Sequence, residues 1–116
     1  MSKILNDIQV APNFNLQEFE SPHTHEIKIV PEVIYKLQAL RILLDKPIQV
    51  TSGYRTLRHN AIVGGHVTSK HMRGLAVDIV VKDVDIDLLE FYAIEVGFKD
   101  VVYYENKGHF HLAIGG

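Results

Sequence analysis

The sequence has no cysteine, so neither disulfide bonds nor thiolate metal sites can hold it together. It has no apolar run long enough to cross a bilayer, and residues 1–10 lack the sustained apolar stretch of a secretory signal. Positive charge is not in excess, because 12 Lys and Arg against 14 Asp and Glu give a formal net charge of -2. This balance argues against non-specific nucleic-acid binding, which requires a concentrated positive field.

The chain of 116 residues suits one small domain, and its 47% hydrophobic and 22% charged residues are ordinary for a globular protein. We expect a single domain over residues 1–116, in which residues 1–12 form an irregular or short-strand lead-in. We also expect a monomer with no membrane span and no nucleic-acid partner. Seven histidines are many for this length, and they are the first compositional indication of function.

Hydrophobic spacing predicts two main helices. The first covers residues 31–45, where Pro31 suits the first turn and Pro47 follows the end. Its predicted buried stripe is Val33, Ile34, Leu37, Leu40, Ile42 and Leu44. The second covers residues 86–96, with Asp85 as its cap and Gly97 as its stop. Shorter helical segments are predicted at residues 16–19, where Asn15 and Glu18 form a capping-box pattern, and at residues 55–62.

Four strands are predicted, at residues 48–51, 75–81, 101–104 and 109–114, with a polar loop at residues 67–73. The last two strands are joined by residues 105–108 as a hairpin. Helices come first and strands mixed with a helix follow, which favours an α+β domain whose antiparallel sheet has helices packed on one face. The predicted core side of the strands carries Leu75, Val77, Ile79, Val81, Phe110, Leu112 and Ile114.

Histidine and aspartate side chains are predicted to meet on the other side of this sheet. His109 and His111 point the same way because side chains alternate along a strand. Asp78 lies in the middle of an apolar strand, where an unpartnered carboxylate is costly. If the two strands are neighbours, these three side chains converge, and His71 in the preceding loop can reach the same spot. Two imidazoles and a carboxylate form a good zinc site that leaves a fourth position for water.

Each of these features alone has an ordinary structural explanation. A His-x-His pair on a strand is more often a surface or packing feature, and a lone buried Asp often serves a turn or a cap. Their combination is less easily explained by packing. From the chemistry alone, a metal site and a purely structural role both stay open.

Three groups of residues resemble a known family. They are Ser52-Gly53-Tyr54-Arg55 with Asn60 and Gly64-Gly65 downstream, Ser69-x-His71-x-x-Gly74-x-Ala76-x-Asp78, and His109-x-His111. Together they resemble the zinc D-alanyl-D-alanine peptidases of family M15, and the similarity runs from Phe14 to Ala113. The resemblance implies the fold that these enzymes share with the Hedgehog signalling domain and with lysostaphin-type and D-Ala-D-Ala dipeptidase metalloenzymes.

The resemblance also implies roles for individual residues. His71, Asp78 and His111 match the ligands of one zinc ion. His109 matches the residue that acts as catalytic base or stabilises the transition state. Other branches of the family place a catalytic Glu three residues before the last ligand, where this chain has Gly108, so the chain resembles the branch with a histidine base.

Two further residues match positions that contact substrate in the family. Arg55 matches the residue that holds a carboxylate or peptide carbonyl of the substrate, and a guanidinium suits a carboxylate because it can bind bidentately. Without the motif, a surface salt bridge would be its more ordinary role. Ser69 matches a residue that hydrogen-bonds substrate. Among the other histidines, His66 is expected to border the cleft, whereas His23 and His25 are expected to be solvent-exposed.

These features lead to three functional hypotheses. The first is a zinc metallopeptidase that hydrolyses peptide bonds in peptidoglycan stem peptides, as a D-alanyl-D-alanine carboxypeptidase or a D,D-endopeptidase. The second is a zinc-binding module of the same fold that binds cell wall or a protein partner without catalysis. The third is an interaction module in which the histidines only pack. Since no export signal is recognised, we expect synthesis in the cytoplasm and action at the cell wall, as in a phage endolysin.

Overall fold

The computed structural model describes residues 5–116, so the first four residues of the predicted lead-in lie outside the described residues. The described part of the lead-in contains β1 (Gln9–Ala11), which pairs with β2 (Phe14–Asn15) in a small antiparallel sheet. A short 3-10 helix, η1 (Leu16–Phe19), follows. Its predicted capping box is confirmed, because the backbone N–H of Gln17 donates to Asn15 Oδ1 at 3.0 Å and that of Asn15 donates to Glu18 Oε2 at 2.7 Å.

The main sheet has four strands in the order β3-β4-β6-β5, and every neighbouring pair is antiparallel. The strands are β3 (Gln49–Ser52), β4 (Ala76–Val80), β5 (Asp100–Tyr104) and β6 (His109–Ala113). Each lies within one residue of its predicted bounds at either end. The α+β class with an antiparallel sheet is therefore confirmed, since β5 and β6 form the predicted hairpin and β6 lies beside β4.

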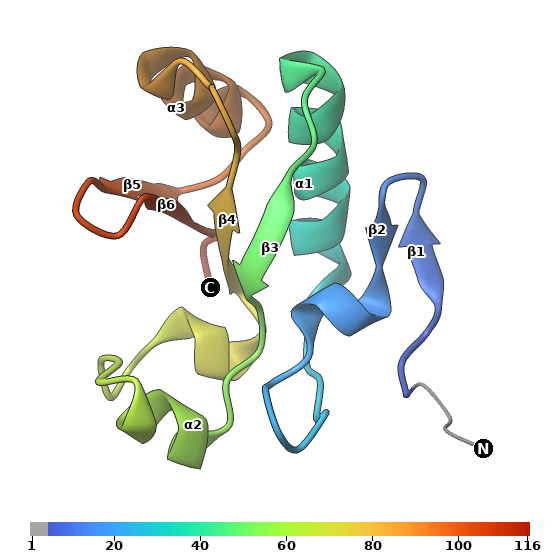
Figure 1. Ribbon diagram of the computed structural model, residues 1–116, viewed down its shortest axis with the longest axis vertical. Coiled ribbons are helices and arrows are strands. Elements are labelled where there is room, and N and C mark those ends of the chain that lie inside the picture. The colour runs from blue at the N-terminus through green and yellow to red at the C-terminus, as the bar shows by residue number, and fades with distance from the viewer. Residues whose placement is uncertain (1–4) are drawn as a thin grey trace.

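Two helices, α1 (Pro31–Leu44) and α3 (Ile86–Glu95), pack side by side against one face of this sheet (Figure 1). The backbone N–H of Leu88 donates to Asp85 Oδ1 at 3.1 Å, which confirms the predicted cap of α3. The predicted stripe of α1 is wrong at one position. Ile42 is 67% exposed, because it is two residues from both Leu40 and Leu44 and therefore falls outside the buried face.

The third helix, α2 (Leu57–Ile62), and a second 3-10 helix, η2 (Lys70–Arg73), lie together at the lower end of Figure 1. The helix α2 is predicted to begin at residue 55. In the structure Thr56 caps it, because Thr56 Oγ1 accepts the backbone N–H of His59 at 3.1 Å. Arg55 therefore lies in extended chain before the helix. The loop predicted at residues 67–73 instead contains η2, which is too short to produce a recognisable hydrophobic period.

The two faces of the sheet differ as predicted. Val77 and Ile79 of β4 and Phe110 and Leu112 of β6 are buried in the core with the helices. Asp78 lies on the opposite face, directly paired with His111 in the β4–β6 register. The fold thus separates an apolar face that stabilises the domain from a polar face that carries the site. Among residues 5–116, none of the helices is both long and apolar enough to cross a membrane.

Candidate metal centre and active site

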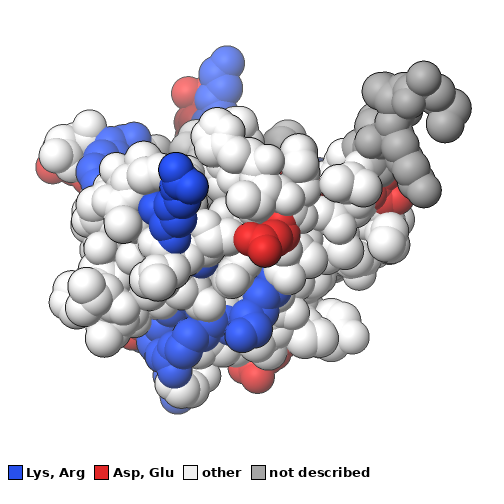
Figure 2. Space-filling view, turned by 90° about the horizontal axis from the view of Figure 1, so that it is seen from below, with Lys and Arg blue, Asp and Glu red and all other residues white. Residues whose placement is uncertain are grey.

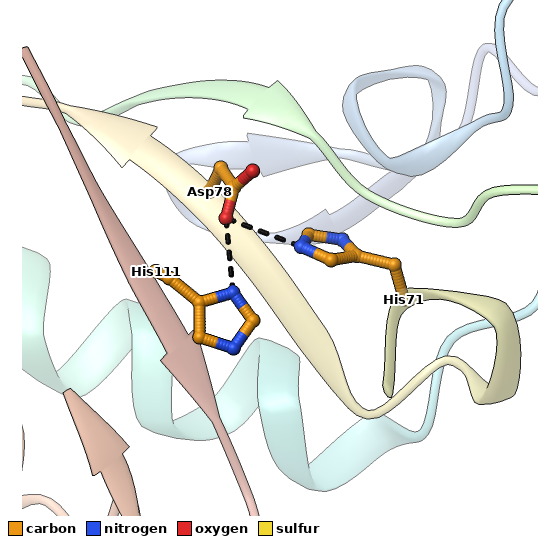
Figure 3. A group of neighbouring side chains, drawn as sticks. All are labelled: His71, Asp78 and His111. Atoms are coloured by element: carbon orange, nitrogen blue, oxygen red, sulfur yellow. Dashed lines mark hydrogen bonds and ion pairs between the residues drawn. The ribbon is translucent and has the colours of Figure 1, made fainter. Parts of the chain in front are cut away.

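Three side chains from separate elements meet at one point on the polar face (Figure 3). His71 comes from η2, Asp78 from the middle of β4 and His111 from β6. His71 Nε2 and His111 Nδ1 each lie 3.1 Å from the same oxygen, Asp78 Oδ1. One nitrogen or oxygen atom from each residue lies within 4.8 Å of the other two, which is close enough for a single metal ion to contact all three.

The hydrogen bonding of His71 indicates that a cation belongs between its ring and Asp78. His71 Nδ1 lies 2.8 Å from the backbone oxygen of Gly53, which can only accept, so Nδ1 carries a proton. In a neutral ring Nε2 is then an acceptor, yet it faces a carboxylate oxygen. Two acceptors at this distance need a proton or a metal ion between them. Fixing one imidazole nitrogen by a backbone carbonyl is also how metal-binding histidines are commonly oriented.

Gly53 places that carbonyl through a close approach of two backbones. A Cβ atom at this position would lie 2.5 Å from the Cα of Phe19 in η1. The neighbouring N–H of Tyr54 donates to the oxygen of Phe19 at 2.8 Å, which fixes the approach. Glycine is required here because no side chain fits between η1 and the end of β3. The Ser52-Gly53 pair, predicted to end a strand, therefore also positions a partner of His71.

The carboxylate of Asp78 is only 4% exposed and remains ionised. Burial acts to raise its pKa, but without a metal the rings of His111 and His71, with a proton on the nitrogen that faces the carboxylate, outweigh burial and hold the pKa of Asp78 well below its usual range. Arg55 Nη2 adds an ion pair to the other oxygen, Asp78 Oδ2, at 3.1 Å. The strand can therefore carry this charge in its middle because basic groups surround it.

Arg55 makes hydrogen bonds within the protein in addition to bordering the cavity. Its Nε donates to Ser52 Oγ at 3.1 Å, and its Nη1 donates to Asn60 Oδ1 at 3.4 Å. Its Nη2 is paired with Asp78, so each guanidinium nitrogen has a partner. The side chain borders the cavity described below, and the predicted contact with substrate stays a prediction. What the structure shows is a residue that holds the carboxylate of Asp78.

His109 and Ser69 also lie at the site. His109 Nε2 lies 3.6 Å from Asp78 Oδ2, and its side chain is 20% exposed, so the ring borders the cluster and still reaches solvent. Ser69 Oγ accepts the backbone N–H of His71 at 3.2 Å and so caps η2. The structure thus brings all six predicted site residues to one place. The catalytic role of His109 and the substrate contact of Ser69 stay predictions.

A cavity of about 410 Å³ opens above this cluster. Residues 63–66 and 68–71 form one side, and β5, β6 and the turn between them supply the other. His66 lines the cavity as predicted, while His23 and His25 are exposed elsewhere. Lys70, Asp100 and Lys107 also line this cavity, and they are not among the predicted site residues. The available signals were the position of Lys70 between Ser69 and His71 and that of Lys107 two residues before His109.

Two imidazole nitrogens and one carboxylate oxygen are the donor set of a zinc site of the catalytic type, with three protein ligands and a position left for water or substrate. The residues present therefore fit a zinc ion. Such a site requires a histidine with a fixed tautomer, an ionised carboxylate and an adjoining cavity, and His71, Asp78 and the cavity above them provide these features.

Comparison with known proteins agrees with this geometry. The peptidase M15 family profile matches residues 7–113. The chain is also 36% identical over 86 residues to the zinc D-Ala-D-Ala carboxypeptidase of Streptomyces albus G. That match covers 71% of this chain but 34% of the relative, so the chain spans about a third of the relative's length. The profile match over residues 7–113 contains all six site residues, from Arg55 to His111. The chain belongs to the peptidase M15 family.

Proposed function

We propose that this chain is a zinc-dependent metallopeptidase that hydrolyses a peptide bond at D-alanine in the stem peptides of peptidoglycan. The observation that carries the proposal is the cluster of His71, Asp78 and His111, whose ligand atoms lie within 4.8 Å of one another beside a cavity. Membership of the peptidase M15 family supports peptide hydrolysis. The relative from Streptomyces albus G is a zinc D-Ala-D-Ala carboxypeptidase, which supports both the metal and the D-alanine bond.

Three ligands hold the ion in this proposal, one further residue transfers protons, and two others hold the ligands in place. When bound, zinc supplies a Lewis acid that activates water and polarises the scissile carbonyl. His109 accepts and returns a proton at Nε2, which suits an imidazole that borders the cavity and binds no metal. Arg55 orients Asp78 through the ion pair to Oδ2, and Ser69 holds the backbone of His71 in place.

Among the bonds open to such an enzyme, we propose the terminal D-alanyl-D-alanine bond, cleaved in the carboxypeptidase mode. The name of the relative favours this mode over an endopeptidase. A D,D-endopeptidase acting on cross-links would use the same site, and so would a phage endolysin. The products distinguish these modes, because a carboxypeptidase releases one free D-alanine and an endopeptidase separates two peptides.

The test combines metal analysis with hydrolysis of defined muropeptides, whose products are identified by mass. We expect one zinc ion per chain and loss of one D-alanine from pentapeptides. His111→Ala should abolish both zinc binding and turnover, because it removes one of three ligands. His23→Ala is the matched control, since His23 is exposed away from the cluster, and it should retain both. Turnover that persists in metal-free buffer would contradict the proposal, and zinc binding without hydrolysis would support the non-catalytic module instead.

A further inference from the structure

The charged side chains around the cavity are unevenly paired. Two carboxylates border it, and both already have a basic partner. Asp78 is paired with Arg55 at 3.1 Å, and Asp100 Oδ2 is paired with Lys70 Nζ at 3.0 Å. Lys70 Nζ also donates to the backbone oxygen of Ile114 at 2.9 Å, so its position is fixed within the protein. The charges of these two basic residues are therefore already paired within the protein.

Lys107 is the remaining lysine or arginine at the cavity. It lies in the turn between β5 and β6, and no ion pair involves it in the part of the chain that the structure describes. Its Nζ lies 5.8 Å from the centroid of the Tyr104 ring, a cation–π distance. The N–H groups of Lys107 and Gly108 both donate to the oxygen of Tyr104, at 3.0 and 2.8 Å, which fixes the turn.

Tyr104 connects this lysine to the proposed proton-transfer residue. Tyr104 pairs directly with His109 in the β5–β6 register, and the two rings lie with centroids 5.4 Å apart. Lys107 is thus held at the side of the cavity where His109 lies. Figure 2 views the end of the molecule that carries α2 and η2, and Lys and Arg side chains gather there in a band while Asp and Glu lie singly.

We propose that Lys107 binds a carboxylate of the peptide substrate and makes the enzyme selective for anionic peptides. The inference rests on the proposed function and names the recognition group for it. Arg55 matches the family position for this contact, but its charge is already paired with Asp78, and it also donates to Ser52 and Asn60. Lys107 has a full charge available at the same cavity. A carboxylate is the anion that every unblocked peptide carries at its end, and some peptides carry a second one on a side chain.

The experiment measures binding, so that its outcome does not depend on turnover. The probes for the zinc-loaded protein are diacetyl-L-lysyl-D-alanine, its C-terminal amide, and an amide-capped peptide with one free glutamate carboxylate. Affinities are measured by calorimetry. We expect wild type to bind a carboxylated probe roughly 3- to 10-fold more tightly than the uncharged amide, as for a partly exposed charge-assisted contact. The probe that shows this preference identifies the terminal or the side-chain carboxylate as the group bound.

Lys107→Gln should remove the preference, whereas Lys107→Arg should keep it because the charge remains. Lys82→Gln is the charge-matched control, since Lys82 is an exposed lysine that does not line the cavity, and it should bind like wild type. Zinc content and melting temperature of each variant report whether the fold is intact. A Lys107→Gln protein that still prefers the carboxylated probe overturns the inference, as does a wild type with no preference for either carboxylate. Hydrolysis of pentapeptides is scored separately, so loss of the proposed activity is distinguished from loss of this contact.

Discussion

At the scale of single residues, Asp78 is the centre of the site. Its Oδ1 faces the two histidines proposed as metal ligands and its Oδ2 faces Arg55, with His109 slightly farther away. The position of this residue in an apolar strand indicated that it needed a partner. The number of partners was not evident, because they come from the segment between β3 and α2, from η2 and from β6. A local pattern in the sequence does not show which distant segments cross the face of a strand.

The depressed pKa of Asp78 gives a prediction for metal-free protein. Its ionised form stabilises the fold at every pH above the ordinary Asp value of about 3.9, and this contribution declines below that value and is lost at the depressed one. Asp78→Asn removes the contribution. We expect the metal-free variant to be less stable than metal-free wild type by roughly 1–3 kcal/mol near neutral pH.

Urea unfolding at neutral pH and in the acid range measures this difference. The gap between the two proteins should narrow as the pH falls below the ordinary Asp range, since wild type then loses what the variant already lacks. A gap that stays constant with pH would show that the ionised carboxylate is not the stabilising form.

At the scale of elements, the long helices and the strands follow from periodicity, while the short segments around the site do not. The bounds of α1 and α3 agree with prediction within one residue because each buries a full apolar face. η2 has four residues and a basic composition, so its conformation depends on the Ser69 cap and on the contact of His71 with Gly53 rather than on a hydrophobic pattern. This is why His71, predicted in a loop, proved to be on a helical turn.

Gly74, which follows η2, gives a prediction at this scale. Its φ is +70°, and a Cβ atom there would lie 2.6 Å from the backbone oxygen of Lys28. Gly108 has nearly the same φ, +71°, but has open space around it. Gly108→Ala should therefore cost about 1–2 kcal/mol of backbone strain alone, whereas Gly74→Ala should cost roughly 3 kcal/mol or more.

Chemical denaturation of both variants separates strain from steric overlap. Because the two glycines share a backbone conformation, the difference between the variants reports the close approach of residue 28 to the start of β4. Equal losses of stability in the two variants would mean that the backbone at residue 28 moves away from the new Cβ atom at no cost.

At the scale of the whole molecule, stability comes from the apolar face of the sheet and the helices upon it. Leu37 is fully buried in this core, while Ile42 on the same helix is 67% exposed. Leu37→Ala should destabilise the protein by about 2–5 kcal/mol, because it leaves a cavity. Ile42→Ala is the matched control and should change stability by about 0.5 kcal/mol or less.

Thermal unfolding of the two variants measures both effects. A large loss from Ile42→Ala would indicate that a partner covers this face of α1 in solution. A small loss from Leu37→Ala would indicate that the core collapses into the space.

The order of residues was enough to predict the types of the long helices and strands, the two faces of β4 and β6, and the three residues proposed as metal ligands. Alternation along a strand and spacing along a helix are local properties of the chain, so they can be read without the fold. The pairing of β4 with β6, the partners of Arg55 and the place of Lys107 at the cavity became evident from the folded structure alone. These contacts join residues that are far apart in the sequence. The local order of residues does not show which distant side chains will meet.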